Sequence, residues 1–473
     1  MTSVALLAAW PLLFGGARSP ASPAAPRALV IRCTPTSVEV VAEARDERDD
    51  SFTVAALQQG QKPAQPLQQK KPPQKVVKNP IAEALTKAKA GATIWLEPGD
   101  YPPFTIGFQS NSPANTTTKG GEPGFPIVVA GTGPGVRILG AEGDTIAIDQ
   151  RVPNAWITFR NLTIVPGRRA GVMFYQRKDG RLHQGYSFED CHILGDFDTE
   201  TGRGKRAKWG VWGQLLSDFR FVGVTAPARI ENISEEHAFY LQNVQGAITI
   251  ENVHARDIGR TFCQFTARVG DGPPAQGDVT VRNCVVEDAC IAQADGFKGG
   301  AAFTICGRMQ GSFLFEKNVY KAGFREERLR FTTQGQPYGT GAFTAWEEGK
   351  AGQTAVLVLR DNDFSFAPGC GDRPVVSIGG CTKVLIVGEN RFASGGRQAA
   401  LVLDPADGQG RTTSTPNGGV FLAPNTKIVG DLLVQGQRAS EDQRAHLEKR
   451  VLDEPAPASQ PETPVLPPPQ GGG

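Results

Sequence analysis

The sequence predicts an all-β solenoid of stacked coils, and three observations indicate this fold class. The first is a short alternating strand that ends on Asn, Asp or Gly and returns eight times between residues 157 and 390. The second is the spacing of these strand ends, 28 to 44 residues, without a helical pattern between them. The third is another alternating strand within each interval. Such a period is typical of repeats that stack into one continuous core.

The returning strand ends are the expected corners of the coil. They are Asn161, Asp190, Gly223, Asn252, Asn283, Asn318, Asn362 and Asn390. Asn, Asp and Gly tolerate the left-handed backbone conformation that a sharp corner requires. We therefore expect Asn252 and Asn283 to occupy equivalent turns of adjacent coils, with Ile250 and Val281 stacked inside.

The second strand of each interval forms another wall, on which side chains alternate between the two faces. The expected inward pairs are Met173 with Tyr175, Phe239 with Leu241, Cys263 with Phe265, Phe303 with Ile305, Phe343 with Ala345, Val376 with Ile378, and Leu401 with Leu403. The expected outward column is Phe174, Tyr240, Gln264, Thr304, Thr344 and Ser377. A column that turns polar between apolar neighbours indicates a sheet with one buried and one solvent-facing side.

The start of the solenoid adds a family resemblance. Residues 89–101, Lys-Ala-Gly-Ala-Thr-Ile-Trp-Leu-Glu-Pro-Gly-Asp-Tyr, are similar to the first coil of many proteins of the pectate-lyase-like superfamily. The resemblance covers about residues 80–435 and implies a right-handed parallel β-helix of about ten coils. Just before it, Asn79-Pro80 and the apolar stripe of Ile81 and Leu85 predict a short capped helix. In this family such a helix plugs the open end of the coil.

The two ends of the chain differ from its middle. Residues 1–25 contain an apolar run, so we expect a secretory signal and a secreted, periplasmic or cell-surface location, although neither Lys nor Arg precedes the run. Residues 26–79, rich in Gln and Pro, are expected to be a linker. The β-helix is assigned to residues 80–439. Residues 440–473 should hold a short helix, with Ser440 and Gln443 in capping-box spacing, and a Pro-rich tail.

Composition limits the partners and the redox chemistry. The net charge of +2 supplies no field for nonspecific binding of nucleic acid or an anionic membrane, and no apolar run is long enough to span a bilayer. Of the eight cysteines, Cys191, Cys263 and Cys284 are expected to be buried thiols. Cys370 and Cys381 flank a loop and a strand, and they are the best candidate for a disulfide.

Known catalytic patterns are not established in this sequence. Arg151-Val-Pro153 begins the pectate-lyase Arg-x-Pro-x-x-Arg signature without completing it, and the clustered aspartates of hydrolases are missing from the expected coils. A lyase that cleaves an acidic glycan needs a base and a cation beside the uronate carboxylate.

Neighbouring coils bring four groups with that chemistry to one wall, and we take them as catalytic candidates: His237, Tyr240, Arg268 and Lys298. The alternative is that they are solvent-facing residues beside loops. If the protein is an enzyme, a polysaccharide lyase is favoured over a glycoside hydrolase.

A second set of residues suits substrate binding through charge and stacking. The candidates are Lys205, Arg206, Trp209, Trp212, Arg256, Arg260 and Gln264. Tryptophan rings stack on sugar rings, and cations contact acidic groups. No cofactor is expected. Calcium is the alternative, because Asp196, Asp198 and Glu200 alternate in one loop, although Thr201 stands where an EF-type loop has Gly and nearby cations compete.

These observations predict an exported β-helix protein that binds or processes a polysaccharide, with lyase-type cleavage of an acidic glycan as the enzymatic form. The alternative is a non-catalytic structural or adhesion module at the cell surface. Product formation from an acidic glycan would favour the enzyme, whereas surface association without product would favour the module.

Overall fold

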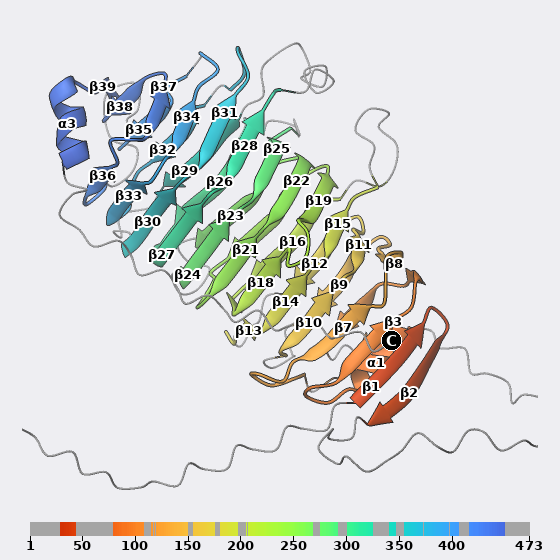
Figure 1. Ribbon diagram of the computed structural model, residues 1–473. Coiled ribbons are helices and arrows are strands. Elements are labelled where there is room, and N and C mark those ends of the chain that lie inside the picture. The colour runs from red at the N-terminus through yellow and green to blue at the C-terminus, as the bar shows by residue number, and fades with distance from the viewer. Residues whose placement is uncertain are drawn as a thin grey trace, which may run out of the picture.

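A computed structural model of the chain describes residues 29–43, 79–107, 115–116, 118, 120–149, 155–175, 180–196, 205, 207–267, 275–291, 300–324, 340–346, 354–371, 373–396, 398–405 and 416–449. Their strands stack into an elongated parallel β-helix, in which three long sheets run from one end to the other (Figure 1). The all-β solenoid predicted from the sequence is confirmed.

The first sheet carries the corner strands. In spatial order its strands are β2 (Ser37–Glu43), β1 (Leu29–Thr34), β3 (Thr93–Leu96), β7 (Ile127–Gly131), β10 (Ile157–Arg160), β14 (Tyr186–Glu189), β18 (Phe219–Val222), β21 (Ile248–Glu251), β24 (Ala275–Arg282), β27 (Met309–Glu316), β30 (Thr354–Arg360), β33 (Lys383–Val387) and β36 (Val420–Leu422). All neighbours are parallel except β1 and β2, which form a hairpin at the N-terminal edge.

The second sheet follows directly after the corners. Its strands are β4 (Gly99–Tyr101), β8 (Val136–Leu139), β11 (Thr163–Val165), β15 (His192–Leu194), β19 (Ala228–Ile233), β22 (Val253–Ile258), β25 (Val285–Ala289), β28 (Val319–Ala322), β31 (Asp363–Phe366), β34 (Arg391–Ala393) and β37 (Lys427–Val429).

The third sheet carries the candidate site. Its strands are β6 (Asn115–Thr116), β5 (Phe104–Ile106), β9 (Asp144–Ile148), β12 (Ala170–Phe174), β16 (Trp209–Gln214), β20 (Phe239–Gln242), β23 (Cys263–Ala267), β26 (Gly300–Gly307), β29 (Thr340–Trp346), β32 (Val376–Ile378), β35 (Leu401–Leu403), β38 (Leu432–Val434) and the antiparallel β39 (Gln437–Arg438). A separate pair, β13 (His183–Gln184) and β17 (Leu216–Ser217), forms a small fourth sheet.

The corners of neighbouring coils coincide where the sequence predicts it. Asn252 and Asn283 have left-handed backbones, with φ of 51° and 54°. The residues two positions earlier, Ile250 and Val281, are register partners on β21 and β24, and both are buried. The expectation for these two corners is confirmed.

The last three corners use asparagine differently. The left-handed residues there are Lys317, Asp361 and Gly388. The expectation is therefore wrong by one residue for Asn318 and Asn362 and by two residues for Asn390. Asn318, Asn362 and Asn390 are instead buried and bond to one another. Asn318 Nδ2 donates to Asn362 Oδ1 at 3.1 Å, and Asn362 Nδ2 donates to Asn390 Oδ1 at 3.2 Å. Their amides satisfy backbone groups that the turn would otherwise leave unpaired.

Cysteine occupies the same inward position in earlier coils. Cys191 and Cys284 each follow a left-handed corner residue and are fully buried, as is Cys263 on β23, and these three expectations are confirmed. Burial raises the pKa of the Cys191 and Cys284 thiols to about 12. Cys370 and Cys381 do not form the predicted disulfide: both are buried, and neither is bridged to another cysteine.

Around β12 of the third sheet the inward and outward assignments of three residues, Met173, Phe174 and Tyr175, are reversed. Phe174 is fully buried, with its ring centroid 5.0 Å from that of Tyr186 in the core. Met173 pairs in register with Trp212, and Trp212 pairs with Tyr240, so the outward column runs through Met173 instead. A shift of one residue exchanges the two faces of a strand, and the apolar segment around Phe174 could not fix that shift.

A helix lies at each end of the solenoid (Figure 1). At the N-terminal end, α1 (Pro80–Lys87) begins after Asn79, whose side chain accepts a hydrogen bond from the Ala82 amide at 3.1 Å. Its buried stripe includes Ile81 and Leu85, which confirms the predicted capped helix. α1 lies beside β1 and β5, so its apolar face covers the first coil.

The C-terminal helix α3 (Glu441–Lys449) packs against β36. Its capping box is formed in both directions: Gln443 N donates to Ser440 Oγ at 3.1 Å, and Ser440 N donates to Gln443 Oε1 at 2.9 Å. No helix in the described ranges is long and apolar enough to cross a membrane.

The β1–β2 hairpin lies within residues 26–79, which we expected to be a linker. Residues 29–43 belong to the first sheet, because β1 pairs in parallel with β3. The expected signal segment, the remainder of the linker and the Pro-rich tail lie outside the described residues.

Candidate functional site

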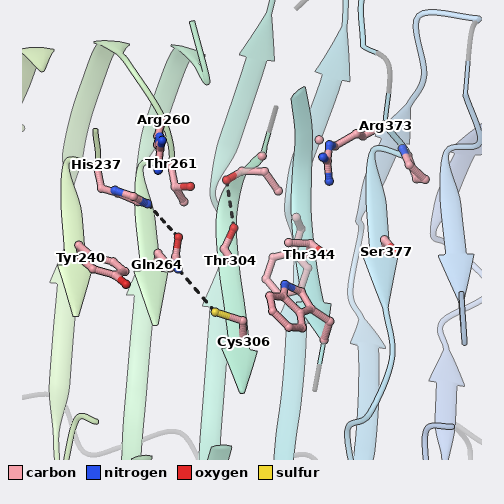
Figure 2. A pocket seen from close by; sticks show the side chains of 16 residues that line it. His237, Tyr240, Arg260, Thr261, Gln264, Thr304, Cys306, Thr344, Arg373 and Ser377 are labelled. Atoms are coloured by element: carbon pink, nitrogen blue, oxygen red, sulfur yellow. Dashed lines mark hydrogen bonds between the residues drawn. The ribbon is translucent and has the colours of Figure 1, made fainter. Parts of the chain in front are cut away.

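A pocket of about 400 Å³ opens on the outer face of the third sheet. Its floor follows the outward column across β20, β23, β26, β29 and β32, where five residues are successive register partners: Tyr240, Gln264, Thr304, Thr344 and Ser377. Figure 2 shows these side chains side by side on neighbouring strands. Four steps of about 4.8 Å give the floor a length of roughly 19 Å. The hollow is therefore long in the direction of the solenoid axis.

Small residues create the hollow. Of the strands in its middle, β26 begins with Gly300 and Ala301, and β29 has Gly341 as its second residue. The flanking strands β23 and β32 are preceded by Arg260 and Arg373. A Cβ atom on Gly341 would lie 3.0 Å from the Pro374 carbonyl oxygen, so the neighbouring coil leaves little room for a side chain. The two arginines therefore lie on either side of these small residues, and Arg260 also contacts Glu236.

His237 is largely enclosed in the pocket, with 6% of its surface exposed. Its Nε2 lies 2.8 Å from Gln264 Oε1 on the next strand. Its ring stacks on that of Tyr240, with 4.7 Å between centroids and 23° between planes. The Tyr240 hydroxyl accepts a hydrogen bond from Gln242 Nε2 at 2.9 Å. The imidazole and the phenol thus form one rigid unit at the β20 end of the floor.

Gln264 connects the His237 imidazole to the thiol of Cys306. Its Nε2 lies 3.6 Å from Cys306 Sγ, so His237, Gln264 and Cys306 form a continuous chain across β23 and β26 (Figure 2). Cys306 lines the pocket but is only 4% exposed. An amide between a histidine and a thiol can accept from one group and donate to the other.

Two arginines lie along the rim where the strands start (Figure 2). Arg260 Nη1 is 3.1 Å from Glu236 Oε2, and both residues precede third-sheet strands. Arg373 precedes β32, three strand steps beyond Arg260, which corresponds to roughly 14 Å along the solenoid. This separation suits two acidic groups of one extended ligand. The opposite rim carries Trp346, a residue that is 40% exposed and whose ring can pack on a ligand.

The structure brings four of the candidate residues together in this pocket, namely His237, Tyr240, Arg260 and Gln264. Trp212 lies beside them, because it pairs with Tyr240 in the outward column. Trp209 precedes it on β16, with 6.5 Å between the two ring centroids. These indoles continue the floor beyond the pocket toward the N-terminal end.

Two further candidates lie elsewhere. Arg256 is on β22 of the second sheet, in register with Glu231 and Glu287, and its Nε is 3.7 Å from Asp257 Oδ2. The amide of Lys205 donates to Asp196 Oδ1 at 3.0 Å, in the loop before β16.

Arg206, Arg268, Lys298, Asp198 and Glu200 lie outside the described residues. Within the described ranges, no group of three or more His, Cys, Asp or Glu side chains is arranged to hold a metal ion.

Sequence reasoning missed Arg373, Cys306 and Trp346. The sequence held a signal for the first, because Arg373 precedes Ser377 by four residues, as Arg260 precedes Gln264. Cys306 and Trp346 are two residues beyond Thr304 and Thr344, and therefore on the same outward face.

No protein-family model matches the chain, and no curated protein matches it. A solved structure with some similarity is the alginate lyase from Paenibacillus sp. strain FPU-7, at 12% sequence identity and a TM-score of 0.35. The alignment covers 67% of this chain and 95% of that enzyme.

Proposed function

We propose that the third-sheet pocket binds an acidic polysaccharide and that the protein processes this chain, with lyase-type cleavage as the reaction. The observation that carries the proposal is the presence of His237 and Tyr240 in the same hollow as Arg260 and Arg373. The pocket's length suits an oligosaccharide, its hydroxyl-lined floor suits sugar hydroxyls, and its arginines suit carboxylates.

The proposed reaction is a β-elimination. A base removes the proton from the carbon next to the carboxylate, a double bond forms between that carbon and its neighbour, and the bond from the neighbour to the glycosidic oxygen breaks. The leaving oxygen takes up a proton. Arg260 or Arg373 would stabilise the negative charge that develops on the carboxylate.

Tyr240 Oη and His237 Nε2 are the atoms proposed to move these protons. The hydrogen bond that Gln242 donates to Tyr240 Oη favours negative charge on that oxygen, which suits a base. His237 stacks on the same ring and can supply a proton from the pocket wall.

A second candidate function is carbohydrate binding without catalysis. It is favoured by the enclosure of His237, since Nε2 is engaged by Gln264 and the ring is mostly covered. In this form, Trp212, Tyr240 and Trp346 would stack on sugar rings while the arginines select acidic chains.

Export to the cell surface and membership of the pectate-lyase-like superfamily belong to the same proposal. They are supported by the apolar segment at residues 4–14 and by the first-coil segment at residues 89–101.

A panel of acidic glycans separates the two functions. Purified protein is incubated with each glycan, and absorbance of unsaturated chain ends is followed while binding is measured by calorimetry. Lyase activity gives absorbance that is lost in Tyr240→Phe. The binding module gives heat without absorbance, and a protein that binds no acidic glycan contradicts both functions.

A further inference from the structure

We propose that Glu236 is a positioning residue that holds a proton on Nδ1 of His237, so that Nε2 is the ring atom whose proton is exchanged at the pocket. The assignment of protons rests on geometry alone. Its consequence for turnover rests on the proposed function.

Glu236 is fixed beside the ring by contacts on both sides. Its Oε2 lies 3.3 Å from His237 Nδ1 and 3.1 Å from Arg260 Nη1. Its carbonyl oxygen accepts a hydrogen bond from the Arg260 amide at 2.7 Å. At Gly259 an added Cβ would lie 2.6 Å from the Ser234 carbonyl oxygen, so the two turns are in close contact. The carboxylate therefore has little freedom to leave the imidazole.

The environment of Nδ1 determines where a proton is stable. Nδ1 is buried and makes no hydrogen bond of regular geometry with any described residue, and the carboxylate oxygen Oε2 of Glu236 faces it at 3.3 Å. A neutral imidazole has a lone pair on one nitrogen and a proton on the other. A lone pair on Nδ1 would face a carboxylate in a mostly buried site, which is repulsive, whereas an N–H there is attracted to it. Nδ1 should therefore be protonated in both the neutral and the charged ring.

The partner of Nε2 can serve either protonation state. Gln264 Oε1 accepts when Nε2 carries a proton, and the turned amide donates its N–H when Nε2 does not. On its other side, Cys306 Sγ is able to accept or to donate. The Gln264 amide can thus reorient without losing either partner, which makes Nε2 the nitrogen that releases and regains a proton.

Nitrogen NMR of the full-length, ¹⁵N-labelled protein tests this assignment. The chain has five histidines, and His237→Gln identifies the His237 signals by their disappearance. Measured where the ring is neutral, His237 is expected to give the Nδ1–H signature. In Glu236→Gln, which keeps the shape and removes the charge, the Nε2–H form should become substantially populated. Glu235→Gln, a matched charge change one residue away, should leave the wild-type signature.

Two results would overturn the proposal. One is a neutral wild-type ring with its proton on Nε2, a result that needs no variant. The other is a wild-type NMR signature of His237 in both Glu236→Gln and Glu236→Ala, the second of which removes the whole carboxylate group.

Turnover supplies a separate readout. If lyase activity is found, Glu236→Gln should lower kcat by about 10-fold or more, because it alters proton transfer at Nε2. The variant also removes the charge partner of Arg260, so KM is measured separately from kcat. An equal effect of Glu235→Gln would contradict a positioning role. If no glycan is cleaved, the proposed function fails, and the NMR result still decides the proton assignment.

Discussion

Arg260 and Arg373 lie on the same rim of one pocket although 113 positions separate them in the sequence, because each stands four residues before an outward-facing polar residue of the third sheet. Because the coils stack, residues at this equivalent position of different coils lie in one row along the solenoid. Between them, Gly300, Ala301 and Gly341 leave the rim open.

We expect Arg373→Ala to weaken binding of an acidic oligosaccharide by about 1.5 to 3 kcal/mol, the usual contribution of a charged hydrogen bond. This is roughly a 10- to 150-fold rise in Kd, measured by calorimetry. Arg256→Ala is the matched control, because Arg256 lies on the second sheet and its side chain is 43% exposed. If the two substitutions raise Kd equally, binding depends on the net charge of the protein and not on the position of Arg373.

Tyr240→Phe should keep binding and abolish turnover. The ring that stacks on His237 remains, while the hydroxyl proposed as base is lost, so kcat should fall by about 100-fold or more. Tyr175→Phe is the control, because its hydroxyl donates to Asp144 at 2.8 Å. Burial raises the pKa of Tyr175 to about 12, which keeps it protonated at neutral pH. Full activity of Tyr240→Phe would remove Tyr240 from the mechanism.

Cys306 should be the thiol that a small alkylating reagent modifies first under native conditions. It lines the pocket, whereas the raised pKa of Cys191 and Cys284, about 12 in each case, leaves almost no thiolate at neutral or mildly basic pH. Mass spectrometry of peptides locates the adduct, and a bound oligosaccharide should slow its formation. Earlier modification of Cys263 or Cys284 would indicate that the pocket does not admit the reagent.

Asn362→Ala should destabilise the fold. Asn362 accepts from the Asn318 amide at 3.0 Å and donates to the Phe315 carbonyl at 2.9 Å, so its removal leaves buried partners unpaired. Each unpaired buried group costs about 1 to 3 kcal/mol. The free energy of unfolding in denaturant should therefore fall by about 2 kcal/mol or more, whereas Thr249→Ala on the outer face of β21 should have little effect.

The sequence predicts the solenoid well because the repeat of its strand ends follows from the geometry of the coil. Each coil must turn, so left-handed residues such as Asn252 and Asn283 recur at intervals of one coil. Alternation on the third-sheet strands likewise indicates which wall carries Tyr240 and Gln264. The same alternation could not orient Met173 and Phe174, because both are apolar and either could face the core.

Other features depend on contacts between coils that a single strand does not reveal. The Asn318–Asn362 ladder bonds side chains 44 residues apart, so neither position alone shows that its amide is buried. The contact of Glu236 with both His237 and Arg260 arises from two abutting turns, which the sequence pattern does not describe.

The location of the glycan site is best tested by a crystal structure of the protein with an acidic oligosaccharide. We expect sugar density on the outer face of the third sheet, between Tyr240 and Ser377, with carboxylates at Arg260 and Arg373. This location would be contradicted by sugar density on the second sheet near Arg256 or by density confined to the loop before Trp209. It would also be contradicted if no acidic oligosaccharide binds.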